Sequence, residues 1–136
     1  PDTIFKQVLP KLKSWHLAPR ENHLIGMAFG AGLAGKRPAV LIQNSGLGLC
    51  LDALFGMFCL YNQGLLMIVS NRGVLEWEEI QHQDWGKCTE SLLLASKIKM
   101  IYFDEEGVEG LKRAAKIAFE NNQVVALMMQ RGNLDE

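Results

Sequence analysis

The sequence lacks the features that mark several large classes of protein. Its three cysteines, Cys50, Cys59 and Cys88, form no Cys-x-x-Cys pair and have no histidine at a zinc-binding spacing. Neither a disulfide framework nor a metal site is therefore indicated, and we expect no metal ligands from this chain. Free thiols suit a reducing cytoplasm, which is the expected location.

Charge and hydropathy argue against two further classes. Fourteen basic and fifteen acidic residues give a net charge of -1, and no basic block stands out. Binding to nucleic acid or to a membrane surface therefore has no support. No apolar run reaches the length of a membrane span, so no membrane-embedded segment is expected.

What the chain does contain is a regular alternation of apolar strands and helical patterns. With 136 residues, 49% of them hydrophobic, it can bury one core, so residues 1–136 are predicted to form a single domain. Strands are expected at the start of the run 40–48 and at 65–70, 98–103 and 124–129, with a polar loop at 74–86. Helices are expected at 3–15, 21–34, 47–60, 89–96 and 105–122, the second of them buried. This order predicts an α/β fold with an open, mostly parallel sheet and helices on both faces.

The run 40–48 is the most informative stretch of the chain. It is a strand-length apolar segment that ends in Gln43, Asn44 and Ser45 and turns through Gly46 and Gly48 into a helix. In open α/β sheets, ligands bind outside the carboxyl ends of the strands, where glycines allow close approach to the backbone. An ordinary strand-turn-helix connection capped by Asn44 or Ser45 explains the same residues equally well.

Two ionisable residues are candidates for chemistry. Glu21 opens a strongly apolar helix, where burial of a carboxylate favours its protonated form, although simple placement at the positive end of the helix dipole is the commoner reason. His82 lies in the polar loop expected at the ligand edge, although a lone loop histidine is more often solvated than catalytic.

A glycine-rich motif at 30–35 imitates a dinucleotide fingerprint. The sequence reads Gly-Ala-Gly-Leu-Ala-Gly, and Asp52 follows near the expected distance. A true fingerprint follows a strand and opens a helix, whereas these glycines close a helix and precede a strand. A dinucleotide site is therefore not favoured, and close helix packing explains the glycines better.

Several motifs in order resemble one family. They are Pro1-Asp2, Glu21 followed by a glycine-rich helix, Gln-Asn-Ser-Gly-Leu-Gly at 43–48, Ser-Asn-Arg-Gly at 70–73, and Gln81-His82 with Gly86 and Thr89. This order resembles the pyrimidine-binding domain of thiamine diphosphate-dependent 2-oxo acid decarboxylases. The branch it resembles most comprises sulfopyruvate decarboxylase alpha subunits and the amino-terminal part of phosphonopyruvate decarboxylases.

The resemblance implies roles for particular residues. Glu21 would hydrogen-bond a ring nitrogen of the cofactor's aminopyrimidine and so help to activate the cofactor as a nucleophile. His82 would be the second catalytic residue, Asn44, Asn71 and Arg72 would contact the substrate, and Arg72 or His82 would meet a sulfonate or phosphonate group. The cofactor-binding residues would be Glu21, Gln43, Asn44, Ser45, Gly46, Leu47 and Gly48.

The resemblance also implies a partner chain. The family's diphosphate and Mg²⁺ site looks like Gly-Asp-Gly followed later by Asn, and this chain contains no Gly-Asp-Gly. The resemblance therefore implies a hetero-oligomer in which a diphosphate-binding subunit holds the metal, with self-association also expected. In two places the chain departs from the family. Leu49, followed by Cys50, comes directly after the Ser-Gly-Leu-Gly motif, where relatives tend to have Asn. The strand that usually precedes the Pro-Asp turn is missing, so upstream sequence is expected.

Three functions remain open on the sequence alone. The first is a subunit of a thiamine diphosphate-dependent decarboxylase acting on a small anionic 2-oxo acid of the sulfopyruvate or phosphonopyruvate type. The second is a noncatalytic regulatory relative with the same fold. The third is an unrelated flavodoxin-like ligand-binding module that uses the same crevice, because one fold hosts many functions.

Overall fold

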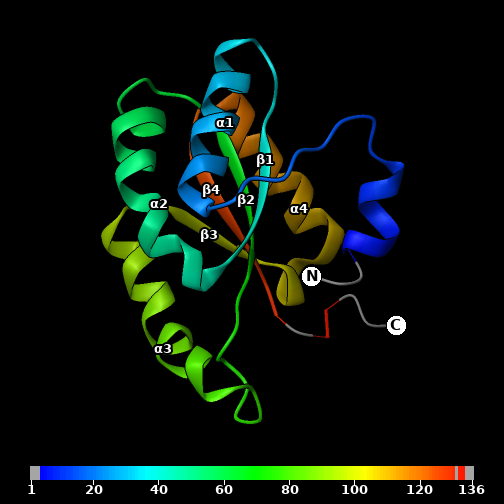
Figure 1. Cartoon of the computed structure of the whole chain (residues 1–136), viewed down its shortest axis with the longest axis vertical. Coiled ribbons are helices and arrows are strands. Elements are labelled where there is room, and N and C mark those ends of the chain that lie inside the picture. The colour runs from blue at the N-terminus through cyan, green and yellow to red at the C-terminus, as the bar shows by residue number, and fades with distance from the viewer. Residues whose placement is uncertain (1–3, 131, 134–136) are drawn as a thin grey trace.

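The computed structural model describes residues 4–130 and 132–133 and confirms the α/β fold (Figure 1). The described residues form one open sheet in which every neighbouring pair of strands is parallel. The strands are β1 (Ala39–Gln43), β2 (Leu65–Ser70), β3 (Lys99–Tyr102) and β4 (Val124–Met129), in the order β1-β2-β4-β3. Parallel pairing brings the carboxyl ends of all four strands to the same edge of the sheet.

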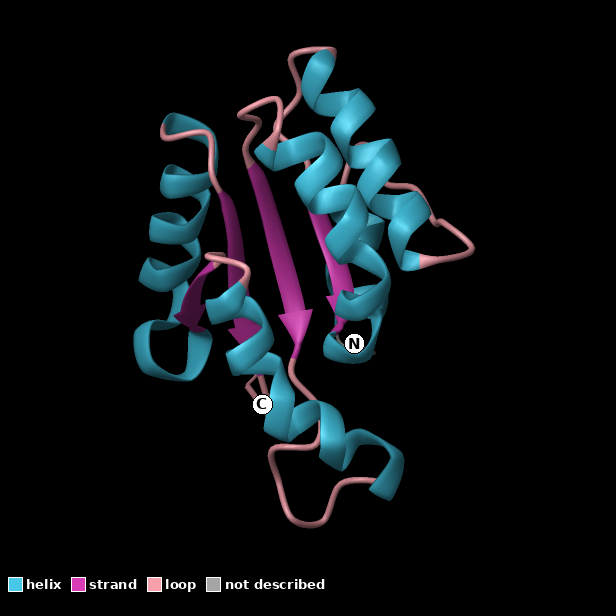
Figure 2. Cartoon of the chain, turned by 90° about the vertical axis from the view of Figure 1, so that its left-hand side faces the viewer, coloured by secondary structure: helices cyan, strands magenta, loops and turns pink. Residues whose placement is uncertain are grey.

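Helices cover both faces of this sheet (Figure 2). One face packs against α1 (Glu21–Leu33), α2 (Leu47–Ala53), its π-helical continuation η4 (Leu54–Cys59) and α3 (Ile80–Ala95), and the other against α4 (Phe103–Glu120). β4 is buried at all six positions, which explains its uninterrupted apolar sequence. None of the helices in the described part of the chain is both long and apolar enough to cross a membrane.

The structure corrects two of the expected helices. The helix expected at 3–15 is instead a π-helical turn, η1 (Ile4–Val8), followed by a 3₁₀ turn, η2 (Leu9–Lys11), and its expected first residue lies outside the described residues. Pro10 lacks a backbone N–H and stops a regular helix from continuing. The loop expected at 74–86 is shorter, because α3 begins at Ile80 and includes the short helix expected at 89–96.

Burial of α1 is the third correction. The helix was expected to be buried, but its buried residues in the described chain are Ile25 and Ala28, whereas Met27 is 45% and Leu33 61% exposed. A methyl group added at Gly26 or Gly30 would meet no described atom within 4 Å. Gly26 and Gly30 are therefore not in close contact with another helix, whereas a methyl group at Gly32 would lie 3.5 Å from the Gln63 Oε1.

Candidate active site

The candidate site lies at the carboxyl ends of β1 and β2. Gln43 at the end of β1 pairs in register with Ser70 at the end of β2. The short 3₁₀ turn η3 (Asn44–Gly46) follows β1, and Asn71 and Arg72 follow β2, so the two polar segments predicted from the sequence lie side by side.

Asn44 ties three segments of the chain together. Its side chain is fully buried, and its Nδ2 donates to Asn71 Oδ1 at 3.1 Å, to the Arg72 carbonyl oxygen at 2.9 Å and to Thr89 Oγ1 at 3.0 Å. Its Oδ1 accepts a hydrogen bond from the Arg72 N–H at 3.2 Å. Both ends of the Asn44 amide are thus engaged within the chain and fix η3, the segment after β2 and α3 relative to one another.

Glu21 lies against the turn that follows β1. A methyl group on Gly46 would lie 2.7 Å from the Glu21 Cδ and 2.9 Å from its Oε1, so any larger residue at this position would force the Glu21 carboxylate to move. Burial, and after it the charge of Glu21, raises the pKa of the Cys50 thiol to about 11. The Glu21 carboxylate therefore lies within electrostatic reach of α2 as well as of η3.

Gln43, Ser45 and His82 meet at the same edge. The Gln43 Nε2 donates to Ser45 Oγ at 3.1 Å and lies 3.1 Å from His82 Nδ1. An amide nitrogen can only donate, so His82 Nδ1 accepts, and the ring hydrogen of neutral His82 lies on Nε2. His82 therefore lies in the first turn of α3 and not in a loop. Gln43, at the end of β1, holds its ring in place.

Glu78 organises the loop between β2 and α3. Its side chain is 1% exposed. Its Oε1 accepts a hydrogen bond from Arg72 Nε, and its Oε2 accepts from the N–H groups of Gly73 at 2.7 Å, Val74 at 3.2 Å and Leu75 at 3.3 Å. One carboxylate therefore satisfies three backbone donors and one guanidinium.

The second carboxylate of this loop, Glu79, has a different setting. Its Oε2 accepts a hydrogen bond from an Arg72 Nη at 2.6 Å and lies 4.0 Å from His82 Nε2, while half of its side chain is exposed. Arg72, predicted from the sequence to contact substrate, is thus paired with both carboxylates. Sequence reasoning missed both pairings, and the available signal was two adjacent glutamates six and seven residues after the arginine.

The remaining predicted residues lie in two different environments. Leu47 is fully buried in the core, whereas Gly48 is exposed, and a methyl group on it would lie 3.1 Å from the Trp85 ring. Leu49, which follows the Ser-Gly-Leu-Gly motif, is 47% exposed. Within residues 4–130 and 132–133, no three His, Cys, Asp or Glu side chains are grouped as metal ligands.

Comparison with known proteins identifies relatives of this chain, although no family model matches it. It is 33% identical over 115 residues to the sulfopyruvate decarboxylase subunit alpha of Methanococcus maripaludis, covering 81% of this chain and 67% of the relative. The subunits alpha of Methanothermobacter thermautotrophicus and Methanocaldococcus jannaschii are each 34% identical, covering 81% and 82% of this chain and 68% and 67% of the relatives. The chain belongs to the family of sulfopyruvate decarboxylase alpha subunits. The resemblance drawn from its motifs is therefore confirmed.

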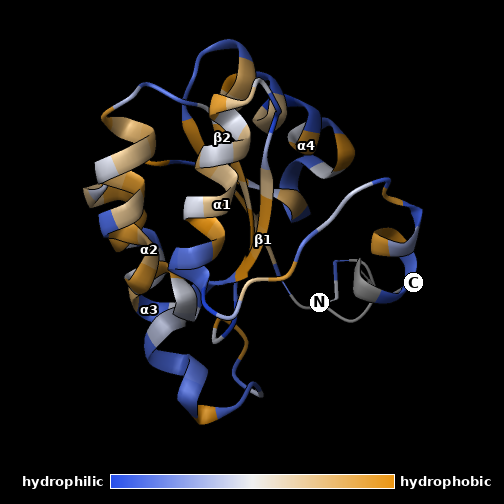
Figure 3. Cartoon of the chain, turned by 45° about the horizontal axis from the view of Figure 1, so that its top comes forward, coloured by the Kyte–Doolittle hydropathy of each residue, from blue (hydrophilic) through white to orange (hydrophobic). Residues whose placement is uncertain are grey.

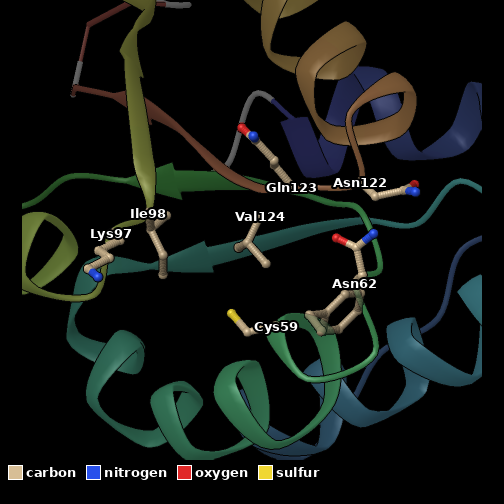
Figure 4. A pocket seen from close by; sticks show the side chains of 8 residues that line it. Cys59, Asn62, Lys97, Ile98, Asn122, Gln123 and Val124 are labelled. Carbon is tan, nitrogen blue, oxygen red and sulfur yellow. The ribbon is translucent and has the colours of Figure 1, made fainter.

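A second group of polar residues lies at the opposite edge of the sheet, at the amino ends of the strands. Their positions at the ends of helices explain why they are polar. A pocket there is lined by Phe58, Cys59, Asn62, Lys97, Ile98, Asn122, Gln123 and Val124 (Figure 4). Asn62, Lys97 and Asn122 have φ of 51°, 54° and 52°, and each follows the end of a helix. The next N–H bonds back five residues in all three cases, as in a Schellman cap, so these side chains mark helix ends.

The ionisation of Glu78 predicts how the stability of this family member depends on pH. Burial raises the pKa of Glu78, but hydrogen bonds from Arg72 and from the N–H groups of Leu75 and Gly73 outweigh it, so the pKa is lowered. The charged form therefore stabilises the fold above the ordinary glutamate pKa of about 4.3, and this contribution is lost as the pH falls through the lower, folded-state pKa. We expect the free energy of unfolding to fall more steeply on acidification in the wild type than in Glu78→Gln.

Urea unfolding between neutral and acid pH measures this difference. Glu76→Gln, which removes an exposed carboxylate of the same loop, is the matched control and should keep the wild-type slope. Equal slopes in the wild type and Glu78→Gln would show that Glu78 is not held as an ion in the folded chain.

Proposed function

We propose that this chain is the pyrimidine-binding subunit of a thiamine diphosphate-dependent decarboxylase acting on a small anionic 2-oxo acid of the sulfopyruvate or phosphonopyruvate type. The observation that carries this proposal is the packing of the Glu21 carboxylate onto Gly46, in a chain that belongs to the sulfopyruvate decarboxylase alpha-subunit family. The proposal makes Glu21 a catalytic residue, and not merely a favourable charge at the start of α1.

The residues present fit the aminopyrimidine end of such a cofactor. A ring nitrogen can share a proton with a carboxyl group, which Glu21 supplies, and the adjacent amide and hydroxyl of Gln43 and Ser45 offer further donors and acceptors. When bound, the cofactor supplies the electron sink that loss of carbon dioxide requires. The part of this chain is to hold the ring through η3 and to exchange a proton with it at the Glu21 carboxylate.

The substrate side of the proposal rests on Arg72 and His82. Both lie at the same edge of the sheet as Gln43, and His82 Nδ1 is 3.1 Å from the Gln43 amide. A guanidinium and an imidazole N–H are donors suited to an oxyanion. An anionic substrate held there would be next to the segment that is proposed to hold the cofactor.

A partner subunit that carries the diphosphate and Mg²⁺ site is the second part of the proposal. A groove runs between α1 and the α2–η4 segment, and the hydropathy of these helices is mostly apolar (Figure 3). We refer to it as the α1–α2 groove; residues that line it include Asn22, His23, Gly26, Met27, Leu49 and Gly56. Pro19 and Asn22, on either side of Glu21 in the sequence, line the groove, so a subunit seated there would reach the proposed cofactor site. The name "subunit alpha" of the relatives also implies a further subunit in those proteins.

Calorimetry and a carbon dioxide release assay test the proposed function. Thiamine diphosphate with Mg²⁺ is titrated into the chain alone and into its mixture with a candidate subunit that contains Gly-Asp-Gly, and the mixture is then given sulfopyruvate or phosphonopyruvate. We expect tight binding and turnover in the mixture only. Cofactor binding without turnover of any 2-oxo acid would indicate a noncatalytic relative, and absence of binding with every partner would overturn the proposal.

A substitution in the α1–α2 groove tests the seat of the partner. A methyl group at Gly26 would meet no described atom within 4 Å, and leucine has a higher helix propensity than glycine, so Gly26→Leu should not lower the stability of the isolated chain. In the complex the same side chain would meet the partner, and overpacking costs about 1–3 kcal/mol, or roughly 5- to 150-fold in affinity. Lys116→Leu on α4, across the sheet, is the control and should bind the partner normally. Normal assembly of Gly26→Leu would place the partner elsewhere.

A further inference from the structure

The carboxylate of Glu79 lies between two groups that bind anions. Its Oε2 is 2.6 Å from an Arg72 Nη and 4.0 Å from His82 Nε2. Neutral His82 carries its hydrogen on Nε2, because Nδ1 accepts from Gln43. Arg72 thus donates to Glu79, and the N–H of His82 lies 4.0 Å from the same carboxylate oxygen.

The two glutamates on Arg72 differ in how firmly they are held. The Glu78 side chain is 1% exposed and takes three backbone N–H groups in addition to Arg72 Nε, so its displacement would open the loop. The Glu79 side chain is 51% exposed, and exposed ion pairs contribute little to stability. Glu78 is therefore the more firmly held partner of Arg72, and Glu79 is the partner that is more accessible to exchange with another anion.

We propose that Glu79 is an internal counter-ion that the anionic tail of the substrate displaces. This inference rests on the proposed function and adds the location of the substrate's sulfonate or phosphonate group, between Arg72 and His82. A tetrahedral oxyanion presents several oxygens and can accept from both donors, whereas a single Glu79 oxygen lies close to Arg72 and distant from His82. Glu79 would then set substrate preference, because uncharged tails cannot compete with its carboxylate.

A purely structural role for Glu79 predicts the opposite effect of its removal. If Glu79 only oriented Arg72, its loss would weaken the binding of anions. If it competes with the substrate, its loss strengthens their binding, because Arg72 keeps its position through Glu78 and no longer has the competitor. The direction of the change therefore separates the two roles.

The experiment titrates methanesulfonate, at fixed ionic strength, into wild type, Glu79→Gln, Glu76→Gln and Arg72→Gln, each as the chain and as its complex with the partner. Binding is followed by the NMR signals of the arginine Nε–H and histidine ring groups. We expect Glu79→Gln to lower the dissociation constant by roughly two- to fivefold, the range for loss of an exposed ion pair, and Glu76→Gln to leave it unchanged. Arg72→Gln should abolish binding. A dissociation constant for Glu79→Gln equal to or higher than that of wild type overturns the inference.

Two further measurements keep the test decisive. Glu79→Asp retains the charge but reaches Arg72 less well, so it should give a smaller gain than Glu79→Gln, and unfolding curves establish that each variant is folded. In the complex, the KM for sulfopyruvate should fall in Glu79→Gln by a larger factor than kcat changes. The methanesulfonate titration requires no turnover, so a failure of the decarboxylase proposal and a failure of the Glu79 proposal give different results.

Discussion

Glu21→Gln is expected to lower the kcat of the assembled enzyme by roughly 10²- to 10⁴-fold, the range that a positioned acid-base group contributes. Glutamine has the size of glutamate, so the packing against Gly46 is retained, but its amide cannot exchange a proton with a ring nitrogen. The loss should appear in kcat at saturating substrate and cofactor, because the defect lies in the chemical step.

Carbon dioxide release and calorimetric cofactor binding are measured on the same preparations. Glu120→Gln, at the far end of α4, removes an exposed carboxylate distant from the candidate site and should retain wild-type turnover. If Glu21→Gln kept a kcat within tenfold of wild type, the carboxylate would not take part in proton transfer, and its position at the start of α1 would be explained by the helix dipole alone.

The strands and the convergence of the site could be predicted from the sequence. Apolar runs bounded by glycine, proline or polar residues fixed the places of β2 and β4, and parallel pairing then required the residues after β1 and β2 to meet. The sequence predicted that Gln43 and His82 lie at the same edge of the sheet. It could not predict their direct contact, because that contact depends on where α3 begins.

The start of α3 could not be predicted, because a tertiary contact determines it. Residues 74–86 have a polar composition without apolar periodicity, and Gly86 lowers helix propensity. In the structure the glycine is needed, since the backbone of Gly73 lies directly on α3 at this point. The pairing of Arg72 with Glu78 and Glu79 depends on the same loop path and was missed for the same reason.

The open face of α1 illustrates a different limit of sequence reasoning. An apolar helix must be covered by something, and the sequence pattern does not say whether the covering residues belong to the same chain. Met27 and Leu33, which are 45% and 61% exposed, are not covered by the described part of the chain. The proposed partner at the α1–α2 groove accounts for Met27, which lines it.

Gly86→Ala is expected to lower the free energy of unfolding by about 1–3 kcal/mol or more, and to separate His82 from Gln43. A methyl group at Gly86 would overlap the carbonyl group of Gly73, and a methyl group at Gly73, which has φ of +81°, would overlap the carbonyl group of His82. These overlaps involve backbone atoms, which cannot move aside as a flexible side chain can. Either the segment after β2 or the first half of α3 must shift, and both hold residues of the candidate site.

Gly26→Ala provides the matched control, because both glycines lie within helices and the substitution is chemically identical. At Gly26 the methyl group meets no described atom within 4 Å, so the gain in helix propensity of about 0.5–1 kcal/mol should raise the stability of the isolated chain. Urea unfolding of the two variants should therefore show changes of opposite sign, and the histidine ring signals should move only in Gly86→Ala. The contrary result would be a Gly86→Ala chain that is as stable as wild type and has unchanged His82 signals. It would mean that the segment after β2 does not pack against α3. The network from Arg72 through Glu79 to His82 would then be assembled in some other way.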